Sequence, residues 1–135
     1  MPGSFFDTNV ILYLASDDLA KADRAEALIR EGGTIGVQVL NEITNVARRK
    51  MRLDWPDTRM FLDMVRGLLT VRPMTVAIHT AGLNLSERHG FSTWDAMVVA
   101  AALDAGSDTL WSEDMHDGLL VAGTLRIRDP FASIA

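Results

Sequence analysis

Residues 5–11, Phe5-Phe6-Asp7-Thr8-Asn9-Val10-Ile11, pass from an apolar run to a helical pattern across one acidic residue. Phe5 and Phe6 form the apolar run. The apolar residues that follow recur at helical spacing, namely Val10, Ile11, Leu14 and Ala15. This order predicts a strand, a turn and a helix. Asp7 is therefore expected at the carboxyl end of a strand.

The rest of the chain repeats this alternation. Helices are expected at about 19–30, from Val39 or Leu40 onward, after the break at 55–57, at 76–88 and at 94–105. Short strands are expected at 35–39, 69–71, 109–111 and, as an edge strand, at 125–127. Strands that alternate with helices predict right-handed βαβ units. We expect residues 1–135 to form a single three-layer α/β/α domain with a central, mostly parallel sheet and helices on both faces.

Composition narrows the class of protein. Of the 135 residues, 48% are hydrophobic and 23% are charged, which fits neither a disordered chain nor a membrane protein. No secretory signal or membrane-spanning run is evident, and the absence of cysteine excludes disulfides and thiolate metal sites. The simplest expectation is a cytoplasmic protein that does not bind membranes. A net charge of −5 argues against nucleic-acid binding, unless several of the acids hold a cation.

Four acids lie at the edges of apolar segments and far apart in sequence: Asp7, Glu42, Asp95 and Asp114. Ligand sites in open parallel sheets form beyond the carboxyl ends of the strands, where strand order reverses, so all four are expected in one cleft. Carboxylates gathered in this way repel one another, and a divalent cation bound between them neutralises this repulsion. An all-oxygen ligand set favours Mg²⁺, with Mn²⁺ as the alternative.

These motifs resemble the PIN domain, a small metal-dependent nuclease fold found in VapC-type toxins of toxin–antitoxin pairs. Phe6-Asp7-Thr8-Asn9-Val10 is similar to the family's first acidic motif, and residues 37–42 are similar to the segment with its glutamate. Trp94-Asp95-Ala96-Met97 resembles the third motif, and Ser112-Glu113-Asp114 the fourth. The resemblance spans nearly the whole chain, with the four motifs in the family's order.

The resemblance implies a Mg²⁺-dependent endoribonuclease that cleaves single-stranded RNA with a metal-activated water. Asp7, Glu42, Asp95 and Asp114 would be the catalytic metal ligands. Supporting roles are implied for Ser112 beside Asp114 and for Thr8 and Asn9 in the turn after Asp7, with Asp117 binding metal through water. The family also implies an antitoxin partner and a homodimer. RNA phosphates or an acidic antitoxin segment are the candidate ligands of a basic cluster, Arg48, Arg49, Lys50 and Arg52.

Each residue also has a simpler interpretation. Asp7 and Asp95 suit helix caps, and Glu42, expected in the first turn of its helix, suits compensation of the helix dipole. The basic cluster likewise suits a helix C-terminus. His116 is a general-base candidate or an unassigned loop residue, and Glu113 is expected to be solvated. Two further functions stay open, a PIN nuclease outside toxin systems, in RNA processing or DNA metabolism, and a catalytically silent PIN-like binding module.

Two groups of large side chains are expected in packing roles. Trp94 and Trp111 have apolar neighbours, which favours packing over base stacking. The stripe at Met60, Phe61 and Met64 is expected in the core or in a dimer contact.

Overall fold

A computed structural model describes residues 3–134 and contains a six-stranded sheet. The strand order is β3-β2-β1-β4-β6-β5, and every neighbouring pair is parallel except β5 and β6. The order runs outward in one direction from β1 to β3 and in the other from β4, so it reverses between β1 and β4. The strands are β1 (Ser4–Phe6), β2 (Thr34–Gly36), β3 (Thr70–Arg72), β4 (Thr109–Trp111), β5 (Leu120–Val121) and β6 (Leu125–Arg128).

The helices begin at recognisable caps. Asp18, Asp54, Thr75 and Ser92 each accept a hydrogen bond from a backbone N–H of the first turn of the helix that follows. The helices are α1 (Thr8–Leu12), continued by the 3₁₀ turn η1 (Tyr13–Ala15), then α2 (Leu19–Arg30), α3 (Val37–Arg49), α4 (Trp55–Leu68), α5 (Val76–His89) and α6 (Thr93–Asp104).

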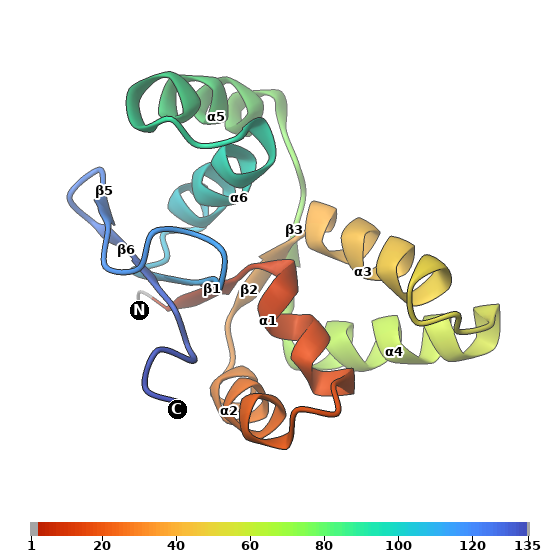
Figure 1. The fold of residues 1–135 in the computed structure, drawn as a ribbon. Coiled ribbons are helices and arrows are strands. Elements are labelled where there is room, and N and C mark those ends of the chain that lie inside the picture. Colours follow the sequence, from red (N-terminus) through yellow and green to blue (C-terminus); the bar gives the residue numbers. More distant parts are fainter. Residues whose placement is uncertain (1–2, 135) are drawn as a thin grey trace.

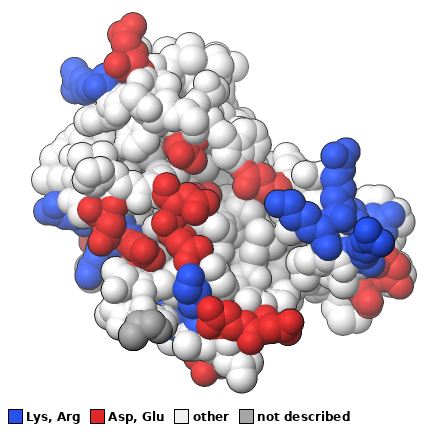
Figure 2. Space-filling view, in the orientation of Figure 1, with Lys and Arg blue, Asp and Glu red and all other residues white. Residues whose placement is uncertain are grey.

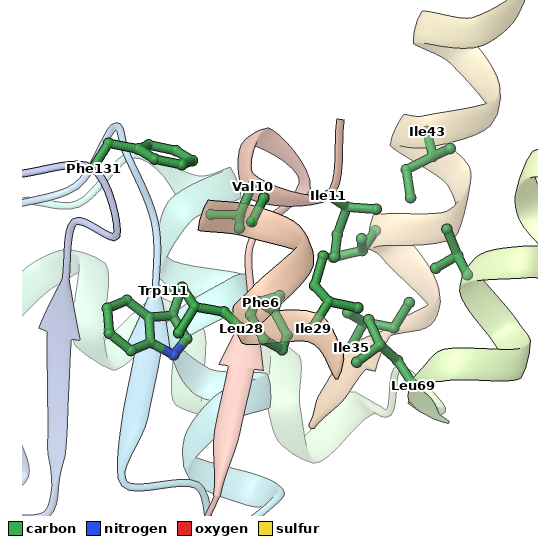
Figure 3. Packing of buried hydrophobic residues seen from close by; sticks show 13 residues of the cluster. Phe6, Val10, Ile11, Leu28, Ile29, Ile35, Ile43, Leu69, Trp111 and Phe131 are labelled. Atoms are coloured by element: carbon green, nitrogen blue, oxygen red, sulfur yellow. The ribbon is translucent and has the colours of Figure 1, made fainter. Parts of the chain in front are cut away.

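The helices form two layers around the sheet. Figure 1 shows α5 and α6 on one side of the strands and α1, α2 and α4 on the other. Successive strand residues point to opposite faces, so Phe5 and Leu110 pack under α6, whereas Phe6 and Trp111 pack under α2. The second of these cores, seen in Figure 3, also holds Ile11, Leu28, Ile29, Ile35 and Ile43. The predicted α/β/α architecture with a mostly parallel sheet is confirmed.

Two element boundaries and the place of the last strand differ from the sequence-based expectation. The second strand stops at Gly36 and α3 begins at Val37, because Val39, Ile43 and Ala47 are buried at helical spacing although Val37 and Val39 alternate as in a strand. Glu42 is therefore the sixth residue of α3 and not in its first turn. The strand at 125–128 is not an edge strand either, since the two-residue β5 pairs with its outer side.

Several large side chains expected in the core are exposed. Met60 is 69% exposed and Met64 is 43% exposed, so the predicted core role is wrong for these two residues. Phe61 is partly buried and packs against the core, as predicted, and a dimer contact of the stripe stays a prediction. Trp111 is buried as predicted, but Trp94 is 45% exposed and belongs to neither of the two cores of the described residues. Among residues 3–134, no helix combines the length and the apolar character needed to cross a bilayer.

Candidate active site

Asp7 and Ser112 meet because they directly follow neighbouring parallel strands. The ladder between β1 and β4 continues by one hydrogen bond, from Asp7 N to Trp111 O at 3.0 Å, and Ser112 N likewise donates to Arg128 O at 3.0 Å. Ser112 Oγ then donates to Asp7 Oδ2 at 2.9 Å, with both residues buried. This contact lies where strand order reverses, the place expected for a ligand site in an open sheet.

Asn9 joins this pair to the acidic loop after β4. Its Nδ2 donates to Asp114 Oδ2 at 3.1 Å and lies 3.4 Å from both Asp7 Oδ2 and Ser112 Oγ. Its Oδ1 accepts from the backbone N of Glu113 at 3.1 Å. The sequence predicted only that Asn9 shapes the turn after Asp7. In the folded protein it connects two carboxylates that lie 107 positions apart in the numbering.

Glu42 belongs to α3 and Asp95 to α6, and these two helices pack on opposite faces of the sheet. Burial raises the pKa of Asp7, of Glu42 and of Asp95. Repulsion adds to each rise: Asp95 and Asp114 raise the pKa of Asp7, Asp7 and Asp95 that of Glu42, and Asp114 that of Asp95. The four acids therefore share one electrostatic environment.

The negative charges of these four acids have no basic partner within the described part of the chain. The three ion pairs among residues 3–134 are Lys21 with Glu113, Arg30 with Glu26, and Arg72 with Asp104, and none includes the four acids. Figure 2 shows Asp and Glu side chains grouped in the middle of one face, with Lys and Arg gathered at the right, on the side of α3 and α4. Asp7 is buried, Glu42 and Asp95 are partly buried and Asp114 is exposed. A cluster of carboxylates without a basic partner is a favourable environment for a cation.

The donor set fits a hard divalent cation. It consists of carboxylate oxygens and the Thr8 hydroxyl, which is buried and forms no hydrogen bond within residues 3–134. Because this hydroxyl lies near Glu42, it opposes part of the rise in the pKa of Glu42. Oxygen ligands are those that Mg²⁺ and Mn²⁺ prefer. No three acidic or histidine side chains of residues 3–134 are grouped closely enough to hold an ion as they stand. Binding by more than two of them therefore requires side-chain rotation.

The simpler helix-terminus roles proposed for Asp7, Asp95 and Glu42 differ in how they compare with the structure. Asp7 does cap α1, since its Oδ1 accepts from Thr8 N at 2.8 Å, while its Oδ2 faces the cluster. At α6 the cap is Ser92, whose Oγ accepts from Asp95 N at 3.1 Å, which leaves the Asp95 carboxylate at the site. Dipole compensation by Glu42 in the first turn of a helix is wrong, because Glu42 lies in the second turn of α3.

Sequence reasoning missed the residues that anchor the acidic loop. Glu113, expected to be solvated, forms an ion pair with Lys21 and accepts a hydrogen bond from Tyr13 Oη at 2.8 Å. Lys21 also lies over the rings of Tyr13 and Phe131. Burial and the Glu113 contact raise the pKa of Tyr13, and the same carboxylate raises that of Lys21. No local signal marks this network, because its members are about 100 positions apart.

The remaining candidates lie around the cluster. Asp117 is exposed, and its Oδ1 accepts from Asp129 N at 2.8 Å, so it fixes the loop exit. His116 is exposed in the same loop. In the basic cluster, Arg48 is engaged, since its Nη1 donates to Leu53 O at 2.7 Å, whereas Arg49, Lys50 and Arg52 are exposed.

The fold and the site together define a small α/β protein with an acidic cluster at the reversal point of its sheet. The family model of the PIN domain matches residues 4–116, and the chain belongs to the PIN domain family. No curated protein matches the sequence.

Solved structures with the same fold include three toxin proteins or complexes. A toxin–antitoxin complex from Klebsiella pneumoniae shares 20% identity with a TM-score of 0.72, covering 95% of this chain and 98% of that one. VapBC2 from Rickettsia felis, bound to a DNA fragment from its promoter, shares 17% identity with a TM-score of 0.66, covering 93% and 97%. VapC20 from Mycobacterium tuberculosis, a toxin that cleaves the sarcin–ricin loop, shares 17% identity with a TM-score of 0.62, covering 80% and 87%.

Proposed function

We propose that residues 1–135 act as one PIN nuclease domain, a divalent-metal-dependent endoribonuclease of the VapC type. The observation that carries this is the cluster of Asp7, Glu42, Asp95 and Asp114. Repulsion within the cluster raises the pKa values of Asp7, Glu42 and Asp95, and none of the four acids has a basic partner among residues 3–134. The similar solved structures named above are toxins or toxin–antitoxin complexes, and one cleaves RNA.

Each residue has a role in this proposal. The four carboxylates would hold the cation, Mg²⁺ or Mn²⁺, which would supply positive charge at the scissile phosphate and lower the pKa of a water. Ser112 orients Asp7 and favours its ionised form through its hydrogen bond to Oδ2. Asn9 fixes Asp114 in the same way. Thr8 Oγ1, which lacks a partner among the described residues, is available as a donor or acceptor beside Glu42.

Replacing single carboxylates tests this function. Asp7→Asn and Asp95→Asn are expected to abolish cleavage of single-stranded RNA in Mg²⁺ or Mn²⁺ without unfolding the protein, since each keeps the shape of its side chain. Asp63→Asn, at an exposed acid of α4, is the matched control and is expected to cleave as the wild type does. Cleavage by Asp7→Asn at the wild-type rate would show that Asp7 is not a ligand.

The biological role proposed is that of a toxin in the cytoplasm, neutralised by an antitoxin protein and assembled as a homodimer. A small neighbouring reading frame for a DNA-binding protein is the expected genetic context, and co-expression of its product is expected to stop cleavage. Two other outcomes define the alternatives. Cleavage with no such partner indicates a PIN nuclease of RNA processing or DNA metabolism, and no cleavage together with no stabilisation by either ion indicates a silent binding module.

A further inference from the structure

A hollow on the hairpin formed by α3 and α4 combines polar, cationic and aromatic side chains. Its volume is about 270 Å³, and it is lined by Asn41, Thr44, Asn45, Arg48, Arg49 and Trp55. Trp55 is 53% exposed, which is unusual for so large an aromatic side chain. Its ring adds nothing to the two buried cores of the described residues. An exposed ring with polar neighbours is a candidate binding surface.

The Trp55 ring is held rigidly. The guanidinium of Arg48 lies over it, with Cζ 4.2 Å from the ring centroid. Arg48 is itself fixed, because its Nη1 donates to Leu53 O at 2.7 Å. Asp54, the residue before Trp55, caps α4 by accepting from Asp57 N at 2.8 Å. A ring fixed in this way loses little conformational entropy when a ligand stacks on it.

The loop beside the ring concentrates positive charge in an acidic protein. Arg49, Lys50 and Arg52 are exposed, and none of them belongs to the three ion pairs found within residues 3–134. Arg52 also has a φ of 55°, a left-handed conformation that a side chain of this size rarely adopts. Unpaired cations next to an aromatic ring suit a ligand that has both phosphates and flat bases.

The hollow and the acidic cluster share one side of α3. Asn45 and Arg49 follow Glu42 by three and seven positions, which places the three on one side of the helix. The rise of an α-helix puts Arg49 about 10 Å along the axis from Glu42. A strand whose phosphate lies at the four carboxylates therefore passes the hollow within a few nucleotides.

We propose that Trp55 and the adjacent face of α3 form a subsite for an unpaired nucleotide of single-stranded RNA, an inference that rests on the proposed nuclease function. The base stacks on the face of the Trp55 ring that Arg48 does not cover. The amides of Asn41 and Asn45 are placed to meet the edge of the base, and Arg49 meets a flanking phosphate. An acidic protein segment would use the cations but has no need of the ring and amides, so the lining favours RNA.

Binding of two fluorescent strands separates stacking from charge. One strand is a mixed-sequence single-stranded RNA, and the other has the same length and phosphates but no bases. Both are titrated into the Asp7→Asn variant so that cleavage does not consume them. Trp55→Ala is expected to weaken RNA binding about ten-fold or more and to leave binding of the abasic strand unchanged. Trp55→Phe keeps a ring and is expected to bind RNA nearly as tightly as the parent.

The charged residue gives a different signature. Arg49→Gln is expected to weaken both strands equally and to reduce the slope of log K against log salt by about 0.7, the value for one phosphate contact on a single strand. Arg88→Gln, at an exposed cation of α5, is the matched control and is expected to leave the slope unchanged. Because Trp55 is exposed, thermal unfolding is expected to show each variant folded.

Two results overturn the subsite. In the first, Trp55→Ala binds RNA as tightly as the parent does. In the second, Trp55→Ala loses the same affinity for the abasic strand as for RNA. If Trp55→Ala binds RNA normally but loses the antitoxin, the surface serves a protein instead. Cleavage assays in the background with Asp7 intact keep the two proposals apart. Absent cleavage by the wild type refutes the nuclease function alone, whereas intact cleavage with unaltered RNA affinity in Trp55→Ala refutes the subsite alone.

Discussion

The hydrogen bond from Ser112 to Asp7 offers a quantitative test of the site. Ser112 is fully buried, and its Oγ lies 2.9 Å from Asp7 Oδ2. Asp7 itself is only 6% exposed. Burial raises the pKa of Asp7, and this hydrogen bond opposes the rise by stabilising the ionised form. Ser112→Ala removes the donor. A hydrogen bond to a charged group contributes about 1.5–3 kcal/mol, so the variant should lose about that much unfolding free energy at neutral pH.

The sign of the pH dependence follows from linkage. Since the hydrogen bond lowers the pKa of Asp7 in the folded protein, its stabilisation is present where Asp7 is ionised and is lost as pH falls through the folded pKa. The difference in unfolding free energy between the wild type and Ser112→Ala should therefore shrink as the pH is lowered. In the variant the pKa of Asp7 rises further, so the acidic limb of the cleavage profile should move to higher pH.

Urea unfolding at a series of pH values from neutral to about pH 4 measures this difference. Ser107→Ala is the matched control, because Ser107 is also buried but has no hydrogen bond to a carboxylate among the described residues. Its destabilisation should not vary with pH. A difference for Ser112→Ala that stays constant from neutral to acidic pH would refute the reasoning, since the hydroxyl would then not act on an ionised Asp7.

Three further predictions concern stability. Mg²⁺ or Mn²⁺ at about a hundred times its Kd should add about 2.7 kcal/mol to the wild type but not to Asp7→Asn, and thermal unfolding should show this gain lost as pH falls and the carboxylates bind protons. Ile43→Ala, at a fully buried residue beside Glu42, should cost about 2–5 kcal/mol in urea unfolding, unlike the exposed Val76→Ala. Gly33→Ala should destabilise by about 1–3 kcal/mol, because the φ of Gly33 is 154° and a Cβ would lie 2.7 Å from Ser4 O and from the Phe6 ring. Gly67→Ala in α4 is the control: a Cβ there has no atom within 4 Å, and the change should be neutral or stabilising.

The site also implies a compromise between stability and function. Burial and mutual repulsion raise the pKa values of Asp7, Glu42 and Asp95, so ionising them at neutral pH opposes folding of the metal-free protein. A bound cation offsets this repulsion. Carboxylates that serve only as helix caps would not need to be gathered in this way.

The sequence by itself determined the class of fold, and it predicted which acids gather at the site. Alternating strand and helix patterns specify a parallel sheet, and residues directly after β1 and β4 must lie at one edge of it. Asp7 and Ser112 follow those strands at once, so their place at one edge was predictable, whereas the sequence predicts that Ser112 supports Asp114 and the structure has it donate to Asp7. Boundaries were less so, because β-branched residues such as Val37 and Val39 fit a strand pattern, and burial of Val39 with Ile43 decided for a helix.

Only the tertiary structure decided which side chains contact one another around this edge. The bridge from Asn9 to Asp114, the pairing of Glu113 with Lys21, and the stacking of Arg48 on an exposed Trp55 depend on distances that no local pattern contains. The first two join residues about 100 positions apart, and the third depends on how two helices pack. Periodicity records which face of an element is apolar, whereas a polar contact between elements depends on where the packed core places their ends.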